Sequence, residues 1–504
     1  MIHKELNLKV IKKINLYISI SALILFITCA ITILGYYHAD EHFQIIEFTG
    51  LKTGFTSSNS LTWEYAAQLR SSLQILFAYA TLKFCDLIAI TNPYYQLMVL
   101  KSISAIYAVI VINYFVNSTQ HLFSNNRVFY RIISFSIWFI PIVSLRFSSE
   151  TWGGITTLLA LSFFQKKYLN TNQNTNKVFF ILGVLLGAAF LFRYQMIFMS
   201  IGLFFWLLLY KKEKITTLFR LILGGIFSVF VGILIDYWYY KELVFSFWNY
   251  FYGNIIKDIA SSFGTSPWYY YLHQIWNIPF FGLLIFISML VFIYKKSNSV
   301  YLWIIVPFFV IHSLVAHKEF RFLFPLIYFM PFIIMVFYNY LQHLFFKKNR
   351  LINLLLMSLF VILNFIFIAT SILKGEDDNG RHKVSKFLFD HYKTKSINII
   401  STPYSSPYSP FGAYPKFYLQ NTNFTETKLK SLCHLDSTKI DPNKLNFFVT
   451  RKVSLQLNPE CEQIISELGF KKIMQSVDNL PETIITKFYN PKFKSSVLIV
   501  YLRN

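Results

Sequence analysis

The chain has 504 residues, of which 55% are hydrophobic, 19% aromatic and only 14% charged. Repeated apolar runs of about 18 to 22 residues are long enough to span the hydrocarbon of a bilayer, which excludes a soluble globular protein. The net charge of +23 does not indicate nucleic-acid binding, because much of the basic charge lies in short turns between apolar runs, where it directs membrane topology. The sequence predicts a polytopic α-helical membrane protein.

The first apolar run ends near Tyr37 and follows a basic stretch with Lys4, Lys9, Lys12 and Lys13. A cleaved signal peptide is the alternative interpretation. The hydrophobic segment is unusually long for one, however, and no clear small-x-small cleavage site follows it. We expect an uncleaved first span with its N-terminus in the cytoplasm.

The stretch Tyr37–Phe48 carries acids and histidines where a hydrophobic helix should leave the bilayer. Read as a helix, it places Asp40, Gln44 and Glu47 on one face, at i, i+4 and i+7. Such a helix can be an interfacial spacer or part of an active site. An isolated carboxylate is ionised at neutral pH and can accept a proton from an attacking hydroxyl, so Asp40 and Glu41 are candidate bases.

The next apolar stretch, Leu73–Ile90, contains Lys83 and Asp86, which are costly at the middle of a bilayer. If this stretch crossed the membrane, every later basic turn would lie outside. We therefore predict a re-entrant or interfacial segment within a long first outer loop, at about 37–95.

Basic turns mark the topology of the remaining membrane part, the last of them at Lys347, Lys348 and Arg350. If all of them face the cytoplasm, the spans between them come in pairs and about 11 spans result. We expect the spans near 14–36, 97–117, 130–147, 153–166, 178–194, 197–210, 218–237, 276–294, 300–316, 322–342 and 351–373. Acids and arginines then collect at outer span ends, which predicts a polar cavity open to that side.

Beyond about Gly375 the composition changes, and short apolar runs alternate with Pro, Asn, Lys and Ser. The pattern predicts a membrane domain over 1–374 and a small extracytoplasmic α/β domain over 375–504. Expected strands lie at Ile397–Ile400, Phe447–Val449 and Val497–Leu502, and expected helices at Lys383–Tyr392 and Cys461–Leu468. Cys433 and Cys461 could form a disulfide if this region is extracytoplasmic.

The stretch His317–Phe322 lies between two apolar spans, on the outer side in this topology. His317, Lys318 and Arg321 are suited to neutralise a phosphate, and Glu319 can orient them. A snorkelling turn is the alternative, but basic residues in an outer turn oppose the positive-inside bias. We therefore expect a phosphate-bearing ligand here.

Trp63 and Tyr65 in the first outer loop offer flat faces for a sugar or a lipid headgroup, although an interfacial aromatic belt has the same composition. No P-loop, glycine-rich nucleotide fingerprint, internal repeat or zinc-type Cys/His spacing is present. We expect neither a cofactor nor a metal.

Several motifs in order resemble the family-22 glycosyltransferases of the GT-C superfamily, the lipid-linked mannosyltransferases of glycosylphosphatidylinositol (GPI) anchor and N-glycan assembly. His317–Phe322 is similar to the His-Lys-Glu-x-Arg-Phe signature, and Asp40–Gln44 with Glu47 resembles the acidic motif of the first luminal loop. Other elements that resemble family motifs are Thr62–Glu64, Leu69–Ser71, Arg146 with Ser149–Glu150, Arg193, Asp236–Tyr240 and Phe263–Tyr271.

This resemblance implies a GT-C fold and an inverting transfer of mannose from a polyprenyl- or dolichyl-phosphate donor to a lipid-linked or glycan acceptor. The site would lie on the outer face of a bacterial inner membrane or of the endoplasmic reticulum. Asp40 is the first candidate for the base and Glu41 the second. His317, Lys318, Arg321 and Arg193 would hold the donor phosphate, while the substrate-positioning residues would be Glu319, Trp63, Glu64, Arg70, Arg146 and Glu150.

Two alternatives stay open at this point. One is a GT-C transferase of another sugar, such as arabinose or aminoarabinose, acting on an envelope lipid. The other is a glycolipid transporter or flippase. Transporters often have inverted repeats and broken helices at the membrane midplane, whereas the charged residues of this sequence gather on one predicted face.

Overall fold

A computed structural model describes residues 2–171, 176–278, 280–346, 350–374, 380–402, 404–409, 414–420, 422–488 and 497–503. The described residues exclude the predicted domain boundary at 375 and most of the basic turn at 347–350. The chain divides into two compact units. The first comprises Met1–Thr28, Thr62–Ala78 and Lys101–Ile366, and the second comprises Cys29–Leu61, Tyr79–Leu100 and Phe367–Asn504.

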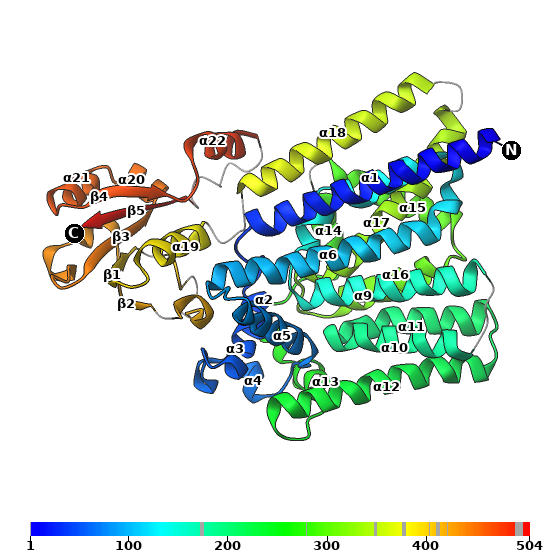
Figure 1. Ribbon diagram of the computed structural model, residues 1–504, viewed down its shortest axis with the longest axis horizontal. Helices are drawn as coiled ribbons and strands as arrows, with labels where there is room; N and C mark the ends of the chain where they lie inside the picture. Colours follow the sequence, from blue (N-terminus) through cyan, green and yellow to red (C-terminus); the bar gives the residue numbers. More distant parts are fainter. Residues whose placement is uncertain are drawn as a thin grey trace. The chain divides into compact units, whose positions relative to one another are not determined.

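The first unit is helical (Figure 1). Its helices are α4 (Trp63–Ala66), α7 (Arg127–Ser136), α8 (Phe139–Ser144), α9 (Ser149–Phe164), α10 (Asn176–Phe192), α11 (Ile197–Phe205), α12 (Ile215–Tyr240), α13 (Ser246–Phe251), α14 (Tyr270–Trp276), α15 (Phe281–Lys295), α16 (Val300–Leu314), the 3₁₀ segment η9 (Phe320–Phe329) and α17 (Met330–Leu341). The helices that continue from one unit into the other are α1 (Ile2–Thr32), α5 (Leu73–Leu87), α6 (Pro93–Thr119) and α18 (Arg350–Lys374).

Among the described residues, five helices are long and apolar enough to cross a membrane. They are Val10–Thr32, Pro93–Ser136, Ile215–Tyr240, Phe320–Leu344 and Leu351–Leu373, and the bent pair α14 and α15 would make a sixth. Asn176–Phe192, Tyr194–Tyr210 and Val300–Leu314 are apolar but shorter. The total of about 11 spans therefore stays a prediction. Helix α5 rises only roughly 22 Å at 1.5 Å per residue, less than the ~30 Å of bilayer hydrocarbon.

Glycines bring α10 and α12 into close contact. A Cβ added at Gly183 would lie 2.0 Å from the Leu221 carbonyl oxygen, and one at Gly224 would lie 2.1 Å from the Phe180 carbonyl oxygen. Small residues of this kind let helix backbones approach closely in membranes, where apolar burial between helices provides little driving force. The glycines of these two helices therefore set their packing distance.

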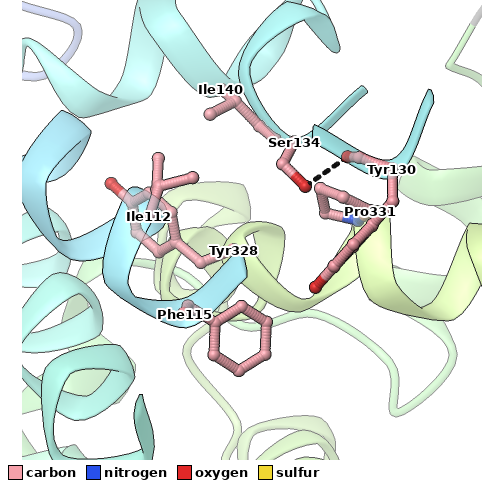
Figure 2. A pocket seen from close by; sticks show the side chains of 7 residues that line it. All are labelled: Ile112, Phe115, Tyr130, Ser134, Ile140, Tyr328 and Pro331. Atoms are coloured by element: carbon pink, nitrogen blue, oxygen red, sulfur yellow. Dashed lines mark hydrogen bonds between the residues drawn. The ribbon is translucent and has the colours of Figure 1, made fainter. Parts of the chain in front are cut away.

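A gap of about 210 Å³ lies among helices of the first unit (Figure 2). It leaves no room for a water-sized molecule. Its lining residues are Ile112, Phe115, Tyr130, Ser134, Ile140, Tyr328 and Pro331. The Ser134 hydroxyl donates to the Tyr130 carbonyl 2.7 Å away.

The second unit contains a helix in the predicted first outer loop, hereafter the outer-loop helix, and a five-stranded sheet. The outer-loop helix runs through α2 (Ala39–Glu41), the π-turn η1 (His42–Ile46) and α3 (Glu47–Thr53). The strands are β1 (Ser396–Ser401), β2 (Asn423–Lys428), β3 (Leu445–Arg451), β4 (Lys471–Gln475) and β5 (Leu498–Arg503), in the order β2-β1-β3-β5-β4. The remaining helices are α19 (Arg381–Tyr392), α20 (Lys452–Leu457), α21 (Glu460–Glu467) and α22 (Asn479–Phe488).

The sheet is mixed, and both of its faces are covered. Strand β1 pairs in parallel with β2 and β3, whereas β5 is antiparallel to β3 and β4. Alternate residues of the central strands contribute to two cores, as the period of a strand requires. Val384 and Leu388 of α19 belong to one core, while Cys461 and Ile465 of α21 belong to the other. The apolar runs predicted as strands form β1, β3 and β5.

Cys433 and Cys461 form a disulfide, with their Cα atoms 5.2 Å apart. The bond joins the 3₁₀ turn η12 (Leu432–His434) to α21. Cys29 and Cys85 are buried thiols, as expected for cysteines in apolar runs.

Candidate active site

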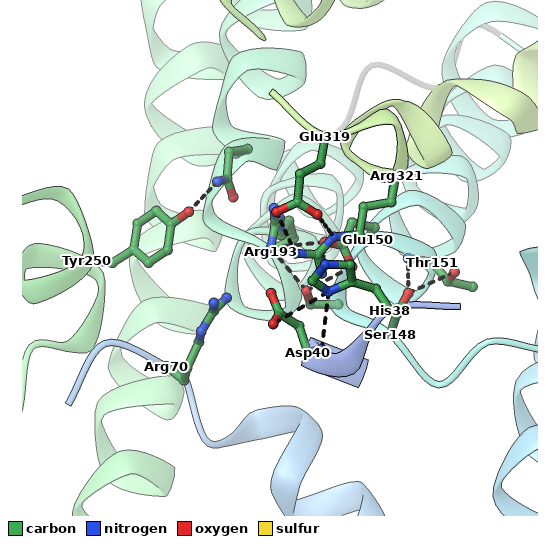
Figure 3. A network of polar contacts seen from close by, with 12 residues as sticks. His38, Asp40, Arg70, Ser148, Glu150, Thr151, Arg193, Tyr250, Glu319 and Arg321 are labelled. Carbon is green, nitrogen blue, oxygen red and sulfur yellow. Dashed lines mark hydrogen bonds and ion pairs between the residues drawn. The ribbon is translucent and has the colours of Figure 1, made fainter. Parts of the chain in front are cut away.

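A buried carboxylate joins two arginines in the first unit (Figure 3). Glu150 lies in the first turn of α9, whose N-cap residue Ser148 accepts a hydrogen bond from a backbone amide of that turn. Its Oε1 atom is 3.2 Å from Arg193 Nη1 and 3.3 Å from Arg321 Nη1. The Glu150 side chain is only 2% exposed. Arg193 Nη1 also donates to the Ser149 hydroxyl over 3.3 Å. One desolvated anion thus holds together two cations from separate segments, Arg193 directly after α10 and Arg321 in η9.

A second carboxylate occupies the planar fork of Arg321. Glu319 accepts from Arg321 Nε over 2.6 Å and from Nη2 over 3.0 Å. Its Oε1 atom also lies 3.1 Å from His317 Nε2. The Glu319 side chain is 22% exposed, so Glu319 is the more accessible of the two acids. A bidentate pair of this kind has the geometry with which guanidinium groups bind phosphate.

An aromatic ring lies against both arginines. The guanidinium carbon of Arg193 is 5.0 Å from the centre of the Phe322 ring, and that of Arg321 is 5.4 Å from it. These distances are within the range of cation–π attraction. The ring therefore orients both cations without neutralising them.

The His317–Lys318 turn is tied to the loop before α14. His317 Nδ1 lies 2.8 Å from the Gly264 carbonyl oxygen. Lys318 Nζ donates to the carbonyls of Ser266 over 2.7 Å and of Val315 over 2.5 Å. Burial lowers the pKa of the Lys318 ammonium. These contacts brace the turn, and the predicted role of Lys318 in holding a phosphate stays a prediction.

Glu64 and Arg70 form a separate ion pair. Arg70 Nη2 donates to Glu64 Oε1 over 2.6 Å, and the Arg70 guanidinium lies 5.6 Å from the centre of the Tyr250 ring. The Tyr250 hydroxyl accepts from Gln195 Nε2 over 2.6 Å (Figure 3). Both members of the pair are predicted site residues, and α13 holds the ring beside them.

Asp236 at the end of α12 fixes the backbone that follows Arg70. One carboxylate oxygen accepts from the Ser72 amide over 2.6 Å, and the other accepts from the Ser246 hydroxyl. The Tyr240 hydroxyl donates to the Arg70 carbonyl over 2.9 Å. Asp236 appears in the sequence only within a motif, and no local pattern shows that it binds an amide 164 residues away.

The two other predicted positioning residues have different environments. Trp63 is 41% exposed and stacks on Phe263, with ring centres 6.3 Å apart and planes at 18°. Arg146 follows α8 and is only 3% exposed. Trp63 can therefore meet a solute directly, whereas Arg146 lies in the protein interior.

The candidate bases lie at the start of the outer-loop helix, in the second unit. The Asp40 side chain is 29% exposed, and its Oδ1 atom is 3.5 Å from His38 Nδ1. His38 Nδ1 also accepts from the Asp40 amide over 3.2 Å and thus caps the helix. Glu41, in contrast, is only 7% exposed. Of the two acids, Asp40 is therefore the better placed to meet an acceptor hydroxyl.

The expected common face of Asp40, Gln44 and Glu47 is not observed as a single environment. Asp40 and Gln44 are half-buried, whereas Glu47 is buried. The reason is the π-turn at His42–Ile46, which adds a residue to one turn and rotates the following helix by roughly 100°. Glu47 instead contacts His42, Thr56 and the Phe417 amide, contacts that sequence periodicity does not reveal.

The charges of the network formed by Arg193, Arg321, Glu150 and Glu319 balance one another. Two guanidinium groups face two carboxylates, so a phosphate must compete for the arginines. Glu319 is the accessible carboxylate, and a phosphate that displaced it would gain a bidentate contact to Arg321 while Glu150 kept both arginines in place.

The matching family model, Alg9-like mannosyltransferase, covers residues 17–411. GPI mannosyltransferase 3 of Candida albicans is 23% identical over 93% of this chain and 94% of its own. GPI alpha-1,2-mannosyltransferase 3 of Homo sapiens is also 23% identical, over 78% of this chain and 70% of its own. Other relatives align over less of their length, such as the Xenopus laevis enzyme, of which 53% is covered.

The fold resembles that of ArnT from Cupriavidus metallidurans, in a crystal structure bound to undecaprenyl phosphate. The TM-score is 0.57 at 8% identity, over 97% of both chains. At this identity the likeness shows the fold alone, which is a GT-C-type helical fold. The family match covers most of the chain and comes with named mannosyltransferases as relatives. The protein therefore belongs to the Alg9-like mannosyltransferase family and is a glycosyltransferase.

Proposed function

We propose that this mannosyltransferase takes mannose from a polyprenyl- or dolichyl-phosphate donor and transfers it with inversion to a hydroxyl of a glycolipid. The observation that carries this proposal is the Arg193–Glu150–Arg321 arrangement, in which the fork of Arg321 rests on the accessible Glu319. Two oriented guanidinium groups beside apolar spans suit a phosphate that leaves on a lipid.

A lipid carrier is favoured over a sugar nucleotide. The sequence contains no P-loop and no glycine-rich nucleotide fingerprint. The ArnT structure with the same kind of fold contains undecaprenyl phosphate. By analogy, we assign the leaving group here to a polyprenyl or dolichyl phosphate.

Asp40 is the proposed base. It would accept the proton of the acceptor hydroxyl while that oxygen attacks the anomeric carbon from the face opposite the phosphate. The bond between the anomeric carbon and the phosphate oxygen breaks, and the lipid phosphate leaves with the electron pair. Arg321 and Arg193 would stabilise its charge. This mechanism requires no metal.

The proposed site faces the lumen or the periplasm. The Cys433–Cys461 disulfide supports an oxidising compartment for the C-terminal region, and the basic turns support the same orientation. The proposed acceptor is a mannosylated GPI lipid, because the relatives are named GPI mannosyltransferases.

The test uses purified protein in lipid nanodiscs, synthetic polyprenyl-phosphate mannose and a mannosylated GPI fragment. We expect transfer of mannose and none from a polyprenyl-phosphate aminoarabinose. Asp40→Asn should lower turnover by about 1,000-fold, which is within the range for loss of a general base, with an unchanged unfolding temperature. Glu467→Gln, which changes an exposed acid of α21, is the control.

The result for Glu41→Gln decides between the two acids. If Asp40→Asn keeps near-normal turnover and Glu41→Gln loses it, Glu41 is the base. If both variants transfer mannose normally, neither acid is the base. Transfer of aminoarabinose in place of mannose would contradict the proposed donor.

A further inference from the structure

The outer-loop helix contains a buried pair that exists only because of its π-turn. His42 Nε2 lies 2.8 Å from Glu47 Oε1, and the two side chains are 2% and 3% exposed. Residues five apart on an α-helix point about 140° away from each other. Here the Glu47 amide bonds to the His42 carbonyl, and this i→i+5 bond aligns the two side chains. The π-turn and the pair therefore depend on each other.

Glu47 also binds a segment far along the chain. Its Oε1 atom accepts from the Phe417 amide over 3.0 Å, across 370 positions of sequence. Its Oε2 atom accepts from the Thr56 hydroxyl over 2.6 Å. A buried carboxylate is stable only when such donors surround it, so the outer-loop helix can keep Glu47 buried only while η11 (Lys416–Leu419) is in contact.

Aromatic rings add to the same contact between the outer-loop helix and η11. The His42 ring stacks on that of Tyr418, with centres 5.1 Å apart and planes at 13°. The Phe55 and Phe417 rings lie 5.3 Å apart. Two consecutive residues of η11 thus contact both ends of the segment 42–55. The hydrogen-bonded Glu47 carboxylate and the stacked His42 ring together fix how the outer-loop helix is rotated about its axis and how closely it packs on η11.

We infer that Glu47 is a positioning residue for mannose transfer, which fixes the rotation of the outer-loop helix, and hence of Asp40, through the C-terminal segment Lys416–Leu419. The inference rests on the proposed role of Asp40. The C-terminal region thereby takes part in catalysis without touching the substrate. Without Glu47, the π-turn loses the contacts that offset its poorer geometry, and the helix can relax by roughly 100°.

The experiment compares Glu47→Ala with Glu47→Gln in full-length protein in nanodiscs, with synthetic polyprenyl-phosphate mannose as donor. For Glu47→Ala we expect kcat to fall about 100-fold, as for a misplaced catalytic group, with the donor KM within about threefold of the wild type. The amide oxygen of glutamine can still accept from the Phe417 amide, and its NH₂ group can donate to the Thr56 hydroxyl, so Glu47→Gln should keep kcat within about tenfold of the wild type.

The matched control is Glu482→Ala. Glu482 is also a buried carboxylate, 3% exposed, and pairs with Lys452 over 2.6 Å in the C-terminal region. This substitution should lower the unfolding temperature without changing kcat per folded molecule. Hydrogen exchange of residues 39–53 supplies a second readout, because it should rise in Glu47→Ala and stay at the wild-type level in Glu482→Ala.

The outcomes separate this inference from the proposed function. Unchanged kcat in Glu47→Ala overturns the positioning role, whether or not exchange of residues 39–53 rises. Equal kcat losses in Glu47→Ala and Glu482→Ala reveal general destabilisation and also overturn it. A third outcome is that exchange rises and kcat falls in Glu47→Ala while Asp40→Asn and Glu41→Gln both stay active. In that case the contact between Glu47 and η11 supports catalysis, but neither Asp40 nor Glu41 is the base.

Discussion

The proposed binding of the donor phosphate depends on the planar, forked shape of the Arg321 guanidinium. Its guanidinium reaches Glu319 with two nitrogens and Glu150 with a third. Lysine would keep the positive charge but has a single ammonium that cannot bridge two acceptors in this way. We expect Arg321→Lys to lower kcat/KM for polyprenyl-phosphate mannose by about 100-fold, roughly 3 kcal/mol of transition-state stabilisation.

Arg220→Lys is a suitable comparison for this variant. Arg220 is exposed on α12, in a basic turn predicted to face the cytoplasm. Its substitution should leave kcat/KM unchanged, because a surface arginine with no planar partner is replaceable. Wild-type kinetics in Arg321→Lys would mean that the fork does not bind the donor phosphate.

A substitution at Glu150 should change the stability of the protein. It is the shared counter-ion of Arg193 and Arg321, and its side chain is 2% exposed. Glu150→Gln leaves two buried cations with one carboxylate fewer, and breaking a buried pair costs about 3–5 kcal/mol. We expect a loss of that order in the free energy of unfolding in detergent, against a change within about 0.5 kcal/mol for the exposed Glu467→Gln. A smaller loss would mean that water reaches the pair.

The members of the charged network could be named from the sequence, but their pairing could not. Charged residues beside apolar spans are conspicuous, and His317–Phe322, Arg193 and Glu150 attract attention for that reason. That Glu150 bridges two arginines depends on how α9, α10 and η9 pack. The contact of Glu47 with Phe417 is still less visible, because it needs both an irregular turn and a partner 370 positions away.

At the scale of elements, the contact between α10 and α12 can be tested with glycines. A Cβ at Gly183 would lie 2.0 Å from a backbone oxygen, whereas at Gly225 the nearest atom would be 3.9 Å away. Gly183→Ala should force the helices apart and cost about 1–3 kcal/mol of stability. Gly225→Ala should be neutral or stabilising by up to about 1 kcal/mol, because alanine favours helix.

Thermal unfolding in one detergent measures both variants. The comparison keeps the chemical change constant and varies only the space available. Equal unfolding temperatures for Gly183→Ala and Gly225→Ala would mean that the two helices do not approach as closely as their backbones do here.

Element types were easier to predict than element lengths. Apolar runs bounded by polar residues predicted β1, β3 and β5, because central strands with both faces covered are apolar throughout. The apolar helices were less regular, since α11 ends in a π-turn at Trp206–Tyr210 and α17 begins after the 3₁₀ segment η9. Hydropathy averages over such changes and cannot locate them.

For the whole molecule, the disulfide gives a direct prediction. The chain has four cysteines, and Cys433 and Cys461 are bonded while Cys29 and Cys85 are thiols. Alkylation of denatured protein should label two cysteines without reductant and four after reduction, as read by mass spectrometry. Four labels without reductant would remove the support for an oxidising compartment.

The same bond should stabilise the second unit. It closes a loop across 28 positions, for which chain entropy predicts a contribution of about 3.6 kcal/mol. The double variant Cys433→Ser/Cys461→Ser should therefore unfold at a lower temperature than the oxidised protein. The reduced wild type should match the variant, and a difference between these two would assign part of the effect to the serines.

The strand order β2-β1-β3-β5-β4 also has a consequence for the order of events during synthesis. Strand β5 is made after β4, yet it lies between β3 and β4. The sheet stays incomplete until residues 498–503 have been synthesised. The outer-loop helix, made more than 400 residues earlier than β5, would then receive its partner η11 in final form only at that late stage. With Glu47 in its proposed positioning role, a nascent chain would thus stay inactive until β5 has been made.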